Sequence, residues 1–229
     1  MTQGQPAAGS MESLYPFLYS GTTDLDAVLE QVRQSTVAKA AEITELRRVI
    51  GARDGARLAA CAADAAARFA AGGRLLAFGN GGSATDAQQL AALFLNPGGT
   101  ARPLPALGLA SDISVVTALC NDIGVDVVFA RQVAALGRRD DIAVGLSTSG
   151  NSENLLRAFD EASRRGMLTV GLAGYEGGKM AELDSIDYLF VAPSSSVHRI
   201  QEAQTTVYHV LWELIQRCLA QAGEAGPGR

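Results

Sequence analysis

The chain has 229 residues, a hydrophobic fraction of 48% and a formal net charge of −5. That length suits one domain, or one domain with an appendage, around a substantial core. The acidic balance excludes the basic footprint of a nucleic-acid-binding protein, so we expect no direct nucleic-acid partner. A small anionic ligand is not excluded, because backbone N–H groups bind phosphate without net positive charge.

The three cysteines, Cys61, Cys120 and Cys218, are an odd number and form no CxxC pair. A disulfide framework or zinc ribbon is therefore not expected, and a cytoplasmic location is predicted. The N-terminus lacks the apolar segment of a signal peptide. No apolar run reaches the ~20 residues needed to cross a bilayer, so we expect no membrane partner.

In chain order, residues 1–20 are polar and are predicted to form a flexible tail. Two helices are expected next, over about 24–50 and 53–71, because apolar residues recur at three- and four-residue spacing and Gly72-Gly73 is typical of a helix end. The apolar stripe of these helices packs either on its own domain or, as we favour, between subunits in a helical bundle.

From Arg74 onward, short apolar runs alternate with Gly/Ser turns and helical stretches. Strands are predicted at 74–78, 103–109, 141–146, 168–172 and 186–191, and helices at 84–95, 113–120, 126–136, 153–165 and 197–220. This alternation predicts an α/β fold, a doubly wound parallel sheet with helices on both faces. We expect a single domain over 21–222 and a disordered tail over 223–229.

The strongest motif is Ser147-Thr148-Ser149-Gly150-Asn151-Ser152, which follows a predicted strand and opens a predicted helix. A phosphate there would meet hydroxyl groups, backbone N–H groups and the positive end of the helix dipole. An ordinary helix cap needs only one such residue. Four hydroxyls within six positions therefore favour phosphate binding over simple capping.

A second glycine-rich turn, Gly79-Asn80-Gly81-Gly82-Ser83, also follows a predicted strand. Its glycines permit positive φ and close approach of a ligand, although a tight turn would have the same composition. Ligands of parallel sheets bind at the carboxyl ends of strands, so both turns are candidate site loops.

Taken together, the ordered motifs resemble the sedoheptulose 7-phosphate isomerase (phosphoheptose isomerase) family of SIS-domain proteins. The segments that carry the resemblance are FGNGGSATDAQQLAALF, NDIGVD, LSTSGNSENLLRAF, GYEGGKMAEL and HRIQEAQTTVYHVLWELI. The resemblance implies an SIS-type fold, a homotetramer built around the N-terminal helices, and a phosphorylated sugar as ligand. The ligand contacts that it implies are Asn80, Gly81, Gly82, Ser83, Asn121, Asp122, Ser147, Thr148, Ser149, Ser152 and Gln201.

The chain departs from this family at its metal site. The resemblance implies that Gln201 and His209 would help to bind zinc, with a His and a Glu four residues apart on the helix after the first loop. Gln89 and Leu93 stand at those two positions here. Glutamine is a poor zinc ligand and leucine can neither ligate zinc nor carry a proton, so zinc binding is doubtful.

Two residues near the start of the last predicted helix are candidate replacements for the missing base, His198 and Glu202. An imidazole titrates near neutral pH and suits proton transfer, but an exposed histidine at a helix start is the simpler interpretation of His198. Asp122 is a further candidate. For His209, ligand contact and a buried structural histidine are weighed equally.

Three functions follow from these observations. The sequence alone favours a sugar-phosphate-binding protein with lost or altered catalysis and a regulatory or scaffold role, because Leu93 replaces the base. The alternative is an active isomerase that converts sedoheptulose 7-phosphate or a similar ketose phosphate with a relocated base. The third is a subunit that completes a hetero-oligomer with an intact paralogue.

Overall fold

A computed structural model describes residues 25–224 of the chain. The chain divides into two compact units, Met1–Glu42 and Ile43–Arg229. The predicted tail at 1–20 lies outside the described residues, as does most of the predicted C-terminal tail. A single domain over 21–222 stays a prediction.

The first element, α2 (Leu25–Ala70), is one continuous helix, so the prediction of two helices was wrong. Gly51 and Gly55 lie inside it with open space around both. A glycine in a helix interior costs only about 1 kcal/mol relative to alanine, and the alanine-rich sequence that follows sustains the helix. Residues 25–42 are exposed, whereas a stripe beginning at Ile43 is buried within the second unit.

The second unit contains a five-stranded sheet in the order β2-β1-β3-β4-β5, and all neighbouring strands pair in parallel. This confirms the predicted fold class. The strands are β1 (Leu75–Gly79), β2 (Ala106–Gly108), β3 (Ile142–Leu146), β4 (Leu168–Gly174) and β5 (Tyr188–Ala192). The edge strand β2 is shorter than predicted because two prolines precede it, and proline cannot donate to a strand ladder.

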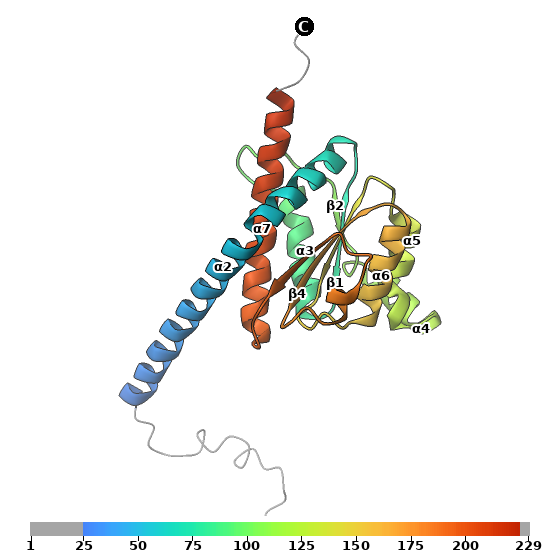
Figure 1. Cartoon of the computed structure of the whole chain (residues 1–229). Helices are drawn as coiled ribbons and strands as arrows, with labels where there is room; N and C mark the ends of the chain where they lie inside the picture. Colours follow the sequence, from blue (N-terminus) through green and yellow to red (C-terminus); the bar gives the residue numbers. More distant parts are fainter. Residues whose placement is uncertain (1–24, 225–229) are drawn as a thin grey trace, which may run out of the picture. The chain divides into compact units, whose positions relative to one another are not determined.

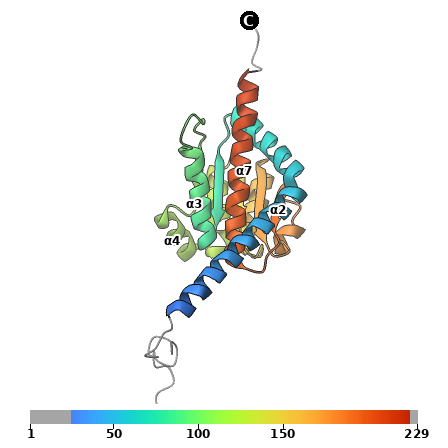
Figure 2. The same cartoon turned by 90° about the vertical axis from the view of Figure 1, so that its left-hand side faces the viewer.

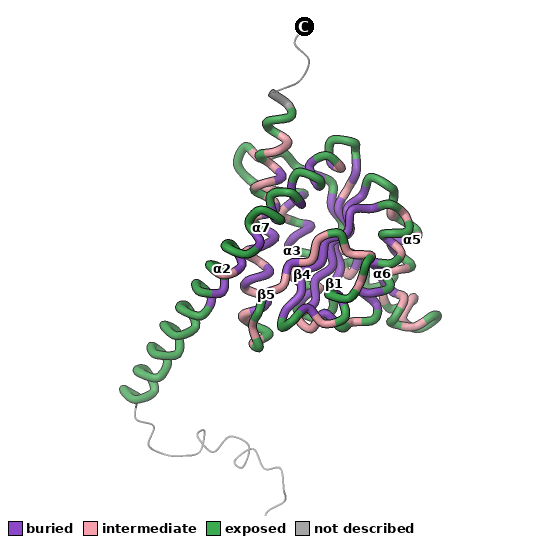
Figure 3. Tube along the Cα trace, viewed as in Figure 1, coloured by how far each residue is buried: buried purple, intermediate pink, exposed green. Residues whose placement is uncertain are grey.

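Helices cover both faces of the sheet (Figures 1 and 2). They are α3 (Gly82–Leu95), α4 (Ile113–Asp122), α5 (Val128–Leu136), α6 (Glu153–Arg164) and α7 (Val197–Glu224), with short 3-10 turns η2 (Val125–Val127) and η3 (Gly178–Glu182). One hydrophobic core joins α3, α7 and the second half of α2 to the sheet, and another joins α5 and α6 to its opposite face. Strands β1, β3 and β4 are buried along their whole length (Figure 3).

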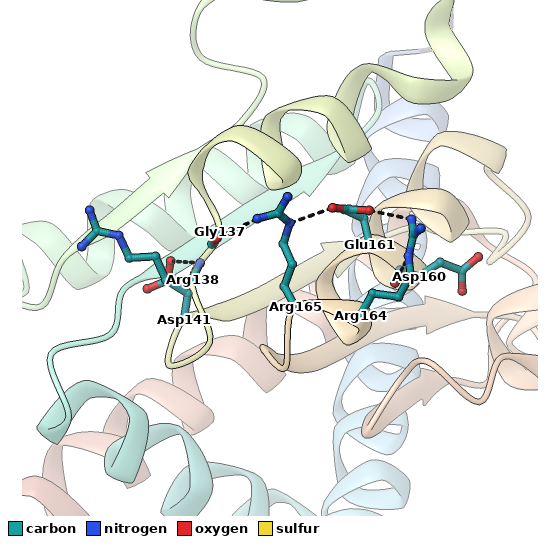
Figure 4. Close-up of polar contacts among 7 residues, drawn as sticks. All are labelled: Gly137, Arg138, Asp141, Asp160, Glu161, Arg164 and Arg165. Atoms are coloured by element: carbon teal, nitrogen blue, oxygen red, sulfur yellow. Dashed lines mark hydrogen bonds and ion pairs between the residues drawn. The ribbon is translucent and has the colours of Figure 1, made fainter.

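The amino ends of the strands are held by polar contacts between helices and turns. Arg68 Nη1 donates to the carbonyl oxygens of Arg139 and Gly166, at 2.5 and 2.9 Å. The guanidinium of Arg165 reaches the Gly137 carbonyl and Glu161 (Figure 4). Buried Asp141 accepts from the backbone N–H groups of Arg74 and Arg138, both at 3.0 Å. This end of the sheet is therefore tied together by satisfied polar groups.

Candidate sugar-phosphate site

The two Ser/Gly-rich loops predicted to hold a ligand leave the sheet side by side. Strand β1 ends at Gly79 and β3 ends at Leu146, and these two residues are direct partners in the sheet. The chain order reverses at this point, because β1 pairs with β2 on one side and β3 on the other. A crevice between such strands is where parallel sheets bind ligands.

The loop Ser147–Ser152, here called the phosphate loop, is held by its own side chains and by α7. Ser147 is buried, and its Oγ accepts from the Gly150 N–H at 3.0 Å. Gln204 Nε2 on α7 donates to the Ser147 carbonyl oxygen at 3.1 Å. Ser147 therefore shapes the loop from inside, whatever contact its hydroxyl makes with a ligand.

The end of the phosphate loop opens α6 without a side-chain cap. Ser152 is the N-cap residue, yet its hydroxyl makes no capping hydrogen bond. The first amides of a helix have no partner within the helix, and the helix dipole adds partial positive charge there. Thr148, Ser149 and Ser152 are each half-buried. The arrangement suits an anion that accepts from these hydroxyls and from the helix amides.

A glycine-rich turn after β4 backs the phosphate loop. A Cβ on Gly150, whose φ is +68°, would lie 1.9 Å from the Gly177 carbonyl oxygen. Met180 N–H donates to the Gly150 carbonyl at 3.0 Å, and Lys179 N–H donates to Asn151 Oδ1 at 2.9 Å. The turn therefore fixes the loop through backbone groups, a role that the sequence did not reveal.

The loop Asn80–Ser83, here called the first loop, contacts both α6 and α7. The side-chain amides of Asn80 and Asn154 pair reciprocally, at 2.9 and 3.0 Å. A Cβ on Gly82 would lie 2.3 Å from Gln201 Nε2, so the Gln201 side chain of α7 lies directly against this glycine. Sequence reasoning missed Asn154, because its partner is far away along the chain.

Asp86, Gln89 and Leu93 follow one another along a single face of α3. Tyr208 Oη on α7 donates to Gln89 Oε1 over a long 3.4 Å. Leu93 packs against the hydrophobic core rather than offering any polar group. Asp86 Oδ2 is buried without a hydrogen-bond partner among the described residues, and this burial raises the pKa of the carboxyl.

The pKa of the Tyr208 phenol is also raised in the folded chain. Burial raises the pKa of its phenol, and the negative charge of Asp86 raises that pKa further, while a hydrogen bond with Thr205 lowers it. The phenol also lies beside the His209 ring, with 5.0 Å between the ring centroids.

The remaining predicted residues differ in their surroundings. His198 is exposed in the first turn of α7, and Glu202 one turn later is ion-paired with Arg199. His209 is exposed. Asn121 and Asp122 are exposed in the last turn of α4, where Asn121 Nδ2 donates to Asp122 Oδ1 at 2.9 Å.

The donor set of this site does not fit zinc. Within residues 25–224, no group of three or more His, Cys, Asp or Glu side chains is arranged to hold a metal ion. Gln89 would be a weak zinc ligand, and Leu93 cannot be a ligand at all.

In the part of the chain that the structure describes, none of the helices has the length and apolar character needed to span a bilayer.

The family model of the SIS domain matches residues 40–174, which is more than half of the chain. The protein is therefore a member of the SIS-domain family of α/β proteins. Similar proteins of known name indicate which branch of the SIS-domain family the chain resembles. A phosphoheptose isomerase from Solidesulfovibrio magneticus is 48% identical over 171 residues, covering 72% of this chain and 82% of the relative. A second phosphoheptose isomerase, from Pelodictyon phaeoclathratiforme, is 42% identical over 193 residues, covering 83% of this chain and 90% of the relative.

Solved structures agree with the sequence relatives. The phosphoheptose isomerase of Neisseria gonorrhoeae superimposes with a TM-score of 0.73 at 35% identity, covering 81% of this chain and 99% of that one. The phosphoheptose isomerase of Francisella tularensis superimposes with a TM-score of 0.70 at 33% identity, covering 86% of this chain and 100% of that one. The chain belongs to the phosphoheptose isomerase family of SIS-domain proteins, as the sequence motifs predicted.

Proposed function

We propose that this protein binds a phosphorylated sugar between the first loop and the phosphate loop, and that it interconverts the ketose and aldose forms of that sugar. The observation that carries the proposal is the uncapped α6 N-terminus at Ser152, beside a loop rich in hydroxyls. The relatives, named phosphoheptose isomerases at 42–49% identity, support a heptose phosphate such as sedoheptulose 7-phosphate.

The phosphate end of the ligand belongs to the loop that opens α6. Thr148, Ser149 and Ser152 donate hydroxyl hydrogens to phosphate oxygens, and the first amides of α6 add backbone donors. No lysine or arginine is required in this arrangement. The sugar hydroxyls then extend toward Asn80, Gln201 and the Asn121-Asp122 pair.

Ketose–aldose interconversion moves one proton from the hydroxyl-bearing carbon next to the carbonyl group to the carbonyl carbon, through an enediol, while a second proton moves from the hydroxyl oxygen to the carbonyl oxygen. A side chain must take the carbon-bound proton and return it. Glu202 and His198, at the α7 end beside Gln201, are the candidate carriers. The described residues at this site do not fit a metal ion.

A second function is a sugar-phosphate sensor that has kept the pocket and lost the chemistry. The position of Leu93, partly buried against the hydrophobic core, favours it, because this side chain offers the site neither a hydrogen-bond donor nor a base. The sensor and the isomerase share the binding site and differ only in turnover.

The test is an assay of the full chain with sedoheptulose 7-phosphate, with and without added zinc, in which the heptose phosphates are separated by chromatography. Product that disappears in Glu202→Ala or His198→Ala, but persists in the exposed α7 control Glu213→Ala, supports the isomerase and its base. Product that persists in both site variants overturns these two carriers. Binding without product favours the sensor, and no binding overturns both functions.

We also propose that the protein is a homo-oligomer, and the tetramer is the form that the family resemblance implies. On α2, the exposed residues Leu25, Val28, Leu29 and Val32 recur at three- and four-residue spacing. A helical segment with such a stripe is marginal in water on its own, and a second copy presenting the same stripe would bury it. Light scattering should give four chains for the wild type and fewer for Leu29→Glu; a monomeric wild type would contradict the proposal.

A further inference from the structure

A buried amide pair connects the two ligand loops. Asn154 is the second residue of α6 and is only 5% exposed. Its Nδ2 donates to Asn80 Oδ1 at 3.0 Å, and Asn80 Nδ2 donates to Asn154 Oδ1 at 2.9 Å. Asn80 is the first residue beyond β1, so the pair joins the first loop to the helix that the phosphate loop opens.

The pair leaves part of the Asn80 amide available. Each asparagine side chain has two N–H hydrogens and two lone pairs, and the reciprocal pair uses one of each. Asn80 is an exposed residue of the first loop, and its second N–H and second lone pair are not used by the pair. Their direction is set by Asn154, because rotating the Asn80 amide breaks both bonds at once.

The sheet fixes where the two loops begin, and the amide pair fixes how they face one another. Gly79 and Leu146 are paired strand residues, which sets the starting points. Beyond them, Gln204 attaches the phosphate loop to α7, and Gln201 lies against Gly82 of the first loop. The Asn80–Asn154 pair is a direct side-chain bond between the first loop and α6.

We propose that Asn154 is a positioning residue, which orients the Asn80 amide so that the sugar portion of the ligand is recognised while its phosphate is held at α6. This rests on the proposed sugar-phosphate function and goes beyond it by naming a residue that touches no ligand. The proposal has a testable consequence. Loss of the pair should weaken binding of the sugar phosphate but not of inorganic phosphate, which reaches only the α6 end.

The experiment is calorimetric titration of the full chain with sedoheptulose 7-phosphate and, separately, with inorganic phosphate. Asn154→Leu keeps the size and burial of the side chain and removes both hydrogen bonds, and Asn154→Ala is the second variant. We expect affinity for the sugar phosphate to fall about tenfold in each, with less than a twofold change for inorganic phosphate. Asn96→Ala, an exposed asparagine after α3, is the matched control and should change neither.

A double-mutant cycle separates positioning from damage to the fold. Asn80→Ala should weaken sugar-phosphate binding as Asn154→Leu does, and the double variant should bind no more weakly than either. Equal losses for inorganic phosphate and sugar phosphate would overturn the proposal, because they indicate a general disturbance of the α6 end. Unchanged sugar-phosphate affinity would overturn it as well.

The same titrations distinguish this proposal from the proposed function. A wild type that binds neither compound overturns the function and the positioning role together. A wild type that binds sugar phosphate, with variants that bind it equally well, overturns only the positioning role. Circular dichroism and thermal melting identify any variant that has failed to fold, and the remaining Asn154 variant then decides the matter.

Discussion

Two aspartates at opposite ends of the sheet have opposite surroundings. Asp141, at the amino end, is 1% exposed and accepts from two backbone N–H groups at 3.0 Å and from the Arg74 guanidinium at 3.3 Å. Asp86, on the helix that begins at the carboxyl end, has one buried oxygen with no partner among the described residues.

The same contrast holds for the neighbouring groups. At the amino end, Arg68 of α2, Arg74 just before β1 and Arg165 just after α6 donate to backbone carbonyl groups of neighbouring segments. At the carboxyl end, Ser152 caps no amide although it stands at the N-cap position. Buried polar groups without partners destabilise a fold. Among the described residues, Asp86 Oδ2 and Gln204 Oε1 are such groups near the ligand loops, and Trp212 Nε1 is one further along α7. The two near the loops are consistent with an end adapted to a ligand.

The largest expected effect tests the carboxyl end. Combining Ser149→Ala with Ser152→Ala removes two hydroxyl donors, each worth about 1.5–3 kcal/mol when it bonds to a charged group. Affinity for sugar phosphate should fall at least a hundredfold, while the free energy of unfolding changes by less than about 0.5 kcal/mol. Calorimetric titration and urea denaturation measure the two quantities. A variant that binds normally, or that loses stability instead, would contradict the contrast between the two ends.

The reverse effect is expected at the amino end. Asp141→Ala leaves two part-buried N–H groups without an acceptor and removes the ion pair of the Arg74 guanidinium, which should lower the free energy of unfolding by about 2–3 kcal/mol. Ligand affinity of the folded protein should stay within twofold of the wild type. The exposed neighbour Asp140→Ala is the control in urea denaturation. A loss of affinity without loss of stability would show that the two ends are not separate.

The sequence predicted the sheet well for a physical reason. Strands covered on both faces are continuous apolar runs, and β1, β3 and β4 have that pattern. The break predicted near Gly51 was wrong. The low helix propensity of a glycine is a small local cost, and the packing of the residues on either side of it outweighs that cost. The edge strand β2 was overestimated because the prolines before it were not weighed against strand pairing.

The site was predicted only where its chemistry is local in the sequence. The phosphate loop is recognisable because four hydroxyls stand within six consecutive positions. Asn154 was missed because one asparagine in an amphipathic helix does not reveal whether it faces solvent or a partner 74 residues away. The glycine turn before Lys179 was missed for the same reason, since its hydrogen bonds to the phosphate loop come from backbone groups.

The smallest expected effect concerns Asp86 and depends on pH. Burial raises the pKa of this carboxyl in the folded chain, so between about 3.9, the ordinary value for aspartate, and that higher pKa, the folded state binds more protons than the unfolded chain. The free energy of unfolding therefore falls as the pH rises through this window and stays at the lower level above it. Asp86→Asn removes the titrating group.

We expect Asp86→Asn to be more stable than the wild type at pH 7, with the difference shrinking as the pH approaches 4. Denaturant midpoints measured between pH 4 and pH 8 test this, with the exposed Asp126→Asn as control. A difference that is constant over this range would mean that the unpartnered oxygen of Asp86 has no electrostatic cost. Asp86 and Asp141 would then differ only in their hydrogen bonds, and the carboxyl end would have to be distinguished by ligand affinity alone.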